Sequence, residues 1–245
     1  MRDLNISGRA SLFGYLIDHI LPTRRVSLLG GSSNVGKTRW TLPAFRDWSE
    51  GKPVLGFHSN PVPWSYVSGD RLLIEAEDSI NSLGIDPKVF NIIPAYGEHN
   101  KTWIQVIEAA EKKKVQFLLW EGFTDFCPPP GQRHQVREFL SSVSACCQPS
   151  KEFPEGLTIL GIVESPKLKP NERYKDPRQR ISGAAAWGYH SSSVFLIERF
   201  KPEDVSNGQR VLYASLKNAP DFDTKGHFEQ NGLLHFPPPG SAENL

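Results

Sequence analysis

The chain has 245 residues, with 28 lysines and arginines against 27 aspartates and glutamates, so its formal net charge is +1. Charged residues make up 22% and apolar residues 38%, which is typical of a globular protein and excludes an intrinsically disordered chain. No apolar run approaches the roughly 20 residues that span a bilayer, so we expect no membrane association. Near-neutrality also excludes a surface coated in basic charge, so any contact with nucleic acid must be local.

Cysteine usage and the first residues bear on the cellular compartment. The three cysteines are odd in number and lack zinc-like spacing, which favours free thiols in a reducing environment. The first residues lack the apolar stretch of a secretory signal. We therefore expect a cytoplasmic protein.

Hydrophobic periodicity, taken in chain order, predicts an α/β protein. Helices are predicted at 11–20, 38–48, 79–83, 102–113 and 135–146. Strands are predicted at 25–29, 64–67, 115–120, 157–163, 194–197 and 211–216. Because strands alternate with helices, we expect a mostly parallel central sheet flanked by helices, in a single domain over 1–235. The polar stretch 165–180 is predicted to be a long loop, and 236–245 an extended or disordered tail.

A glycine-rich loop follows the strand predicted at 25–29. Gly-Ser-Ser-Asn-Val-Gly-Lys-Thr matches G-x-x-x-x-G-K-[ST] at every specified position, and it lies between a strand and a helix. The backbone N–H groups of such a loop cradle phosphates. We expect Lys37 to reach the β- and γ-phosphates of ATP, and the Thr38 hydroxyl to ligate Mg²⁺. The predicted nucleotide-binding residues are Gly31, Ser32, Ser33, Asn34, Val35, Gly36, Lys37 and Thr38.

A carboxylate that positions magnesium is expected at the end of a buried strand. The apolar run Phe-Leu-Leu-Trp leads directly to Glu121, at a position where such sites more often have Asp. The alternative is that Glu121 is a charge that merely ends a strand.

The order of these motifs resembles that of the RecA-like hexameric P-loop ATPases, most closely the plasmid replicative helicases of the RepA type. The resemblance covers about residues 10–200 and rests on four blocks: 26–38, 66–86, 119–126, and 159–167 with 180–185. It implies a RecA-like fold, ATP hydrolysis with Mg²⁺, and a homo-oligomeric ring, hexameric in the family. It also implies single-stranded DNA as a partner and a helicase or DNA motor acting in replication.

The resemblance also assigns a catalytic carboxylate and a sensor. In this family a carboxylate after the second strand polarises the attacking water, and Asp70 is the matching position. The family more often has Glu there, so Glu75 and Glu77, close behind, remain alternatives. At the sensor position the family has His or Gln, and this chain has Glu164, which we expect to orient water or to pair with Lys167.

An arginine finger is the last element that the resemblance implies. In ring assemblies a subunit supplies Lys or Arg to the nucleotide of its neighbour. Arg180 matches the family's arginine before a block of small residues, and Lys167 and Arg178 are further candidates. The alternative is a solvated basic loop. Residues 167–180 carry six basic and two acidic side chains, a local excess of four positive charges that suits a phosphate or a DNA strand.

Two other functions stay open. A non-motor ATPase, acting as a nucleotide switch, loader or assembly factor for a protein partner, is favoured by the short chain, the atypical carboxylates and the near-zero charge. A small-molecule kinase would use the loop at 165–180 as a lid.

Overall fold

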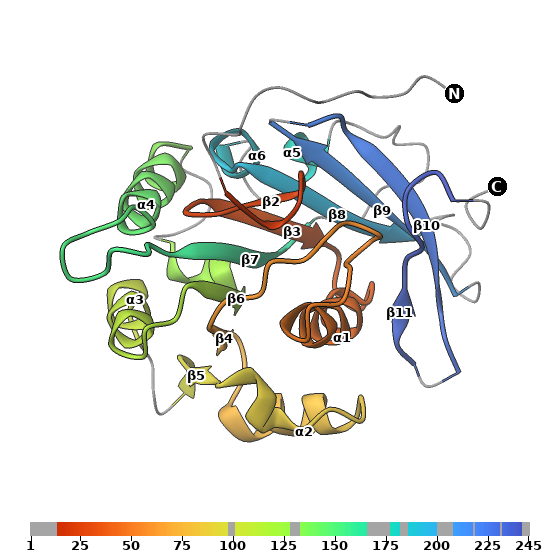
Figure 1. Cartoon of the computed structure of the whole chain (residues 1–245), viewed down its shortest axis with the longest axis horizontal. Helices are drawn as coiled ribbons and strands as arrows, with labels where there is room; N and C mark the ends of the chain where they lie inside the picture. Colours follow the sequence, from red (N-terminus) through yellow and green to blue (C-terminus); the bar gives the residue numbers. More distant parts are fainter. Residues whose placement is uncertain are drawn as a thin grey trace.

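A mostly parallel sheet forms the centre of the protein (Figure 1). The computed structural model describes residues 14–97, 101–127, 133–165, 177–181, 186–199, 208–217, 219–230 and 232–241. Within them, nine strands pair in the order β11-β10-β9-β8-β3-β7-β6-β4-β5. The strands from β8 to β5 in this order are parallel, and β9, β10 and β11 extend the sheet beyond β8 in antiparallel pairs.

The strands of this sheet are β3 (Val26–Gly31), β4 (Trp64–Ser68), β5 (Ile93–Pro94), β6 (Phe117–Glu121), β7 (Thr158–Glu164), β8 (Ser193–Arg199), β9 (Gln209–Leu216), β10 (Phe222–Phe228) and β11 (Leu234–His235). The helices are α1 (Lys37–Ser49), α2 (Leu73–Asn81), α3 (Trp103–Lys112), α4 (Arg133–Cys146), α5 (Pro177–Arg180) and α6 (Ala186–His190), with 3₁₀ turns η1 (Pro87–Phe90) and η3 (Phe123–Phe126). The predicted α/β class with a mostly parallel sheet is confirmed.

Helices cover both faces of the sheet, and successive side chains of a strand enter different cores. In β6, Phe117 and Leu119 belong to a core shared with α1 and α2, and the Phe45 ring of α1 stacks on Phe117 with centroids 5.0 Å apart. Leu118 and Trp120 belong to a second core, shared with α3, α4 and α6. A strand buried on both faces is apolar throughout. Burial of this kind is the source of the apolar runs in the sequence. The strands predicted at 25–29, 64–67, 115–120, 157–163, 194–197 and 211–216 are confirmed.

The helix predicted at 11–20 is wrong over its described residues. The chain instead forms a small hairpin, in which β1 (Tyr15–Ile17) pairs antiparallel with β2 (Leu21–Pro22). The carbonyl of Leu16 accepts a hydrogen bond of 3.0 Å from the Trp48 indole of α1. The apolar side chains of this segment are buried in the hairpin as well as they would be on a helix face. The helical spacing alone therefore does not determine the structure, and contacts with other segments favour the hairpin.

Three further differences lie where apolar periodicity is weak. Helix α2 begins at Leu73 rather than at 79. Strand β10 was not predicted because the residues that it buries, Thr224 and Gly226, have no large apolar side chain. The predicted loop at 165–180 ends in the helical turn α5, whereas 166–176 lie outside the described residues.

The segment predicted as a tail begins as packed chain. The Phe236 ring lies edge-on to Trp40 of α1, with centroids 5.8 Å apart, and Thr224 donates a 2.8 Å hydrogen bond to the carbonyl of Pro237. Residues 242–245 lie outside the described residues. No helix in the described part of the chain is long and apolar enough to cross a membrane.

Candidate nucleotide-binding site

The glycine-rich loop leads from β3, in the interior of the sheet, into the first turn of α1. Asn34 and Gly36 have φ angles of 61° and 109°, in the left-handed region. A Cβ on Gly36 would lie 2.9 Å from Cζ of Phe228, so the strand β10 leaves no room for a side chain there. The loop therefore turns through left-handed residues and ends at a helix N-terminus, a position that suits an anion.

Lys37 is folded back over this loop. Its Nζ donates hydrogen bonds of 2.6 Å and 3.1 Å to the carbonyls of Gly31 and Ser32. Burial lowers the pKa of the Lys37 ammonium, and the charges of nearby carboxylates oppose this shift. The carboxylates belong to Glu164, Glu121 and Asp70. Lys37 thus faces several acidic groups at the mouth of the loop.

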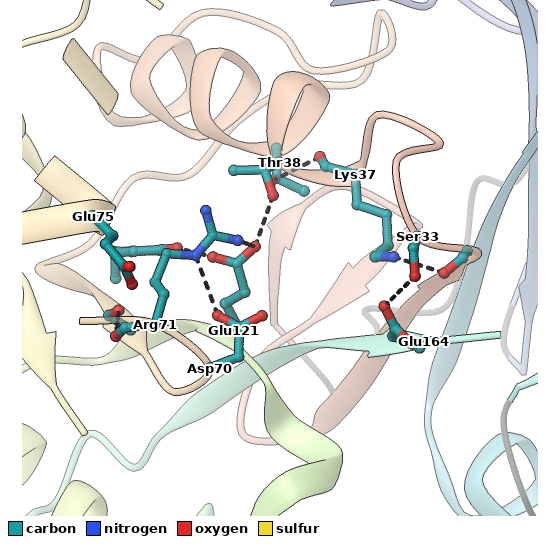
Figure 2. Close-up of polar contacts among 12 residues, drawn as sticks. Ser33, Lys37, Thr38, Asp70, Arg71, Glu75, Glu121 and Glu164 are labelled. Atoms are coloured by element: carbon teal, nitrogen blue, oxygen red, sulfur yellow. Dashed lines mark hydrogen bonds and ion pairs between the residues drawn. The ribbon is translucent and has the colours of Figure 1, made fainter. Parts of the chain in front are cut away.

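The structure brings together the two predicted magnesium ligands. Oγ1 of Thr38 donates a 2.7 Å hydrogen bond to Oε1 of Glu121, at the end of β6 (Figure 2). Glu121 is only 4% exposed. Burial raises the pKa of its carboxyl and the charge of Asp70 adds to this, whereas Arg71 and hydrogen bonds from Tyr66 and Thr38 oppose it. A hydroxyl and a carboxylate are hard oxygen ligands that suit Mg²⁺.

Two residues that sequence reasoning missed hold Glu121 in place. The Tyr66 hydroxyl, buried in β4, donates to Oε2 of Glu121. Nη2 of Arg71 lies 2.8 Å from Oε1 of Glu121, and Nε lies 3.3 Å from Oδ1 of Asp70 (Figure 2). The sequence held one signal for Arg71, which directly follows Asp70, the predicted catalytic carboxylate. It held none for Tyr66, whose contact with Glu121 depends on β4 and β6 being neighbours in the sheet.

Of the three candidates for the catalytic carboxylate, Asp70 is the one that lines the cleft beside the loop, among the described residues. A Cβ on Gly69 would overlap the carbonyl oxygen of Glu121, so this glycine permits the ends of β4 and β6 to approach. Glu75 is directed elsewhere, because it accepts a 2.9 Å hydrogen bond from the N–H of Leu72 at the start of α2 (Figure 2). Glu77 lies further along α2 and also stands outside the lining.

Glu164, the predicted sensor, contacts the loop itself. Its Oε1 accepts a 2.7 Å hydrogen bond from Oγ of Ser33. The predicted partner Lys167 lies outside the described residues. Asp125 joins the same acidic group: burial raises the pKa of its carboxyl, and the charges of Asp70 and Glu164 raise it further. This end of the cleft would repel nucleotide phosphates unless a divalent cation were bound with them.

The cleft has a volume of about 1230 Å³ and extends past the loop toward β9 and β10. At that end the guanidinium of Arg210 lies 4.8 Å from the centroid of the Phe228 ring, and Nε of Arg210 donates a 2.9 Å hydrogen bond to the carbonyl of Val35. Arg39 lies 5.8 Å from the same centroid. Guanidinium groups and an aromatic ring suit the base and ribose end of a nucleotide.

Arg180, the predicted arginine finger, is not among the residues that line this cleft. The residue is 9% exposed, and its guanidinium forms an ion pair with Glu198 of β8 in its own subunit. Arg178 is also buried, and it donates to the carbonyls of Gly188, Ser191 and Ser215. An arginine finger that reaches the nucleotide of a neighbouring subunit has to extend out of its own subunit. The role of Arg180 therefore stays a prediction that requires the Glu198 pair to open.

Replacing Arg180 with alanine is expected to lower the free energy of unfolding by about 3–5 kcal/mol, because Glu198 would be left buried without its counter-ion. Urea denaturation measures this loss. The double variant Arg180→Met/Glu198→Leu removes both charges and is expected to regain most of the stability. A loss below about 1 kcal/mol for Arg180→Ala, the range of an exposed pair, would contradict the buried pair.

A comparison of the chain with models of known protein families and with curated proteins gives no match. Among the described residues, no group of three or more His, Cys, Asp and Glu side chains is arranged to hold a metal ion. A nucleotide-bound Mg²⁺ needs few protein ligands, since water and phosphate oxygens complete its shell. The Thr38 hydroxyl and the Glu121 carboxylate therefore fit such an ion.

Proposed function

We propose that this chain is an ATPase of the RecA-like P-loop type, which hydrolyses ATP with Mg²⁺. The observation that carries the proposal is the meeting of three strand ends at one cleft. The loop after β3 supplies Lys37 and Thr38, β6 ends in Glu121, and Asp70 follows β4. These residues came from separate sequence motifs, and their convergence is what phosphoryl-transfer chemistry needs.

Each side chain has a role in this chemistry. The loop N–H groups and the N-terminus of α1 bind the β- and γ-phosphates, and Lys37 exchanges the carbonyls of Gly31 and Ser32 for phosphate oxygens. Thr38 and Glu121 would hold Mg²⁺, which would supply positive charge to neutralise the phosphates. Asp70 orients a water and accepts its proton as the water oxygen bonds to the γ-phosphorus. The bond from that phosphorus to the bridging oxygen breaks, and ADP leaves.

We further propose that the chain assembles into a homo-oligomeric ring, hexameric as in the RepA-type helicases, that acts on single-stranded DNA. The order of the motifs and the basic stretch at 167–180 support this, although most of that stretch lies outside the described residues. ATP hydrolysis measured with and without single-stranded DNA, together with the oligomeric state under the same conditions, tests it. DNA-stimulated hydrolysis by a ring is expected. Hydrolysis without any response to DNA would indicate the non-motor switch instead.

Asp70→Asn is expected to reduce kcat by about 10²–10⁴-fold while ATP still binds, because an amide cannot accept the proton of the attacking water. Steady-state hydrolysis and binding of a fluorescent ATP analogue measure the two effects. Glu75→Gln and Glu77→Gln serve as matched controls and should keep near-wild-type kcat. Loss of activity in either control, with Asp70→Asn active, would transfer the role to that glutamate.

A further inference from the structure

Arg71 lies between the carboxylates of the catalytic cleft and lines that cleft (Figure 2). Its side chain is 28% exposed, and the described residues take hydrogen bonds only from Nε and Nη2. The Oγ of Ser68 donates a 2.8 Å hydrogen bond to the Arg71 carbonyl, which fixes its backbone just after β4. The backbone of Arg71 is therefore held in place, while the guanidinium still has N–H groups available to a ligand in the cleft.

The contact between Arg71 and Glu121 uses an atom that magnesium would need. Oε1 of Glu121 accepts from both Thr38 and Arg71, and this hydroxyl and this carboxylate are the pair that fits Mg²⁺. Arg71 thus neutralises Glu121 in the structure as a bound cation would. Once Glu121 serves a metal ion, its attraction for Arg71 weakens, and a nucleotide phosphate bound in the cleft is an anion that can take its place at Nη2 of Arg71.

At this end of the cleft, carboxylates outnumber basic groups, so bound phosphates need a basic group in addition to Lys37. Four carboxylates, those of Asp70, Glu121, Asp125 and Glu164, line it together with Lys37 and Arg71. The buried pair with Glu198 keeps Arg180 out of the same cleft. Arg39 and Arg210 also line the cleft, but they lie at its other end, beside Phe228. Among the described arginines that line the cleft, Arg71 is therefore the one that lies beside these carboxylates, where charge develops on the γ-phosphate.

We propose that Arg71 acts in cis as the arginine that stabilises the transferring phosphoryl group, and that it exchanges Glu121 for this group when Mg²⁺ and nucleotide bind. The inference rests on the proposed ATPase function. A guanidinium is always charged and its planar fork matches two phosphate oxygens. Such an arginine, supplied in cis or in trans, contributes about 10³–10⁵-fold to kcat in other phosphate-loop enzymes.

The first test compares Arg71→Ala and Arg71→Lys with the control Arg137→Ala, an exposed arginine of α4 outside the cleft lining. Arg71→Ala is expected to lower kcat by about 10³-fold or more. Arg71→Lys keeps a positive charge beside Glu121 and so protects the fold, but it lacks the fork and should stay at least about 10²-fold below wild type. Arg137→Ala should match the wild type.

The second test needs no turnover. Binding of ADP and of ADP with aluminium fluoride, a mimic of the transferring phosphoryl group, is measured for wild type and Arg71→Lys. The variant should bind ADP as the wild type does and should lose the added affinity for the fluoride complex. Equal affinity for that complex in the two proteins would overturn the inference, as would wild-type kcat in Arg71→Ala.

Mixing two variant proteins separates action in cis from action in trans. A mixture of Arg71→Ala chains with Lys37→Ala chains is expected to stay inactive, because no subunit in it has both Arg71 and Lys37 at its own nucleotide. Recovered hydrolysis would show that Arg71 serves a neighbour and would overturn the role in cis. A wild-type chain that neither binds nor hydrolyses ATP would overturn the proposed function itself, whereas active wild type with unaffected Arg71 variants overturns this inference alone.

Discussion

Lys37→Ala is expected to reduce ATP hydrolysis to background, a loss of at least about 10³-fold, and to weaken ATP binding. The Lys37 ammonium is held directly over the phosphate loop, with Nζ at 2.6 Å and 3.1 Å from two loop carbonyls. Without it, the acidic side chains around the loop face the phosphates with less compensation. Hydrolysis under saturating ATP and Mg²⁺, and titration with a fluorescent ATP analogue, measure the two losses.

The matched control for Lys37→Ala is Lys112→Ala, which removes an exposed lysine from the last turn of α3. It keeps the net charge equal to that of the test variant and should leave hydrolysis unchanged. Thermal unfolding of both variants checks that each is folded. Retained hydrolysis in Lys37→Ala would rule out the phosphate loop as the catalytic nucleotide site.

Features that depend on neighbouring residues could be predicted, because they leave a continuous signal along the chain. The loop from Gly31 to Thr38 is such a case, since its chemistry uses one backbone turn and two adjacent side chains. The strand containing Glu121 is another, because burial on both faces makes its preceding residues apolar. The prediction that Thr38 and Glu121 meet followed from their chemistry, and the structure places their oxygens 2.7 Å apart.

Features that depend on strand order could not be predicted in the same way. Tyr66 reaches Glu121 because β4 lies directly beside β6, and Ser33 reaches Glu164 because β7 lies beside β3. Neither neighbour relation can be read from local sequence. The burial of Arg180 was not predicted either, because the segment around it is polar and basic. A counter-ion on β8, Glu198, permits the burial of its guanidinium.

The N-terminal hairpin shows how a pattern can fit two structures. The spacing of apolar residues at 11–20 suits a helix face, and the structure buries Leu16, Ile17 and Ile20 within a hairpin instead. The amide of Asn60 donates a 3.0 Å hydrogen bond to the Tyr15 carbonyl, which is available because the chain is extended there. Periodicity reports which side chains are buried more reliably than it reports which backbone buries them.

Glu121→Gln is expected to reduce Mg²⁺-dependent kcat by about 10²–10³-fold and to raise the Mg²⁺ concentration needed for half-maximal rate. The amide matches the carboxylate in size, and its oxygen can still accept from Thr38 or Tyr66, so the packing at the end of β6 is preserved. What is lost is the negative charge that holds the cation beside Thr38. Hydrolysis measured across a range of Mg²⁺ concentrations separates weaker metal binding from a slower chemical step.

Glu108→Gln, an exposed position on α3, changes the net charge by the same amount and should keep the wild-type Mg²⁺ dependence. The loss of stability in Glu121→Gln is expected to be small, although the amide N–H₂ faces a donor, because burial disfavours the ionised carboxylate and Arg71 retains its contact with Asp70. A Glu121→Gln protein with unaltered kcat and Mg²⁺ dependence would leave the Thr38 contact as a strand-end hydrogen bond. Asp70 or Asp125, which line the same cleft, would then be the carboxylate to test for the metal.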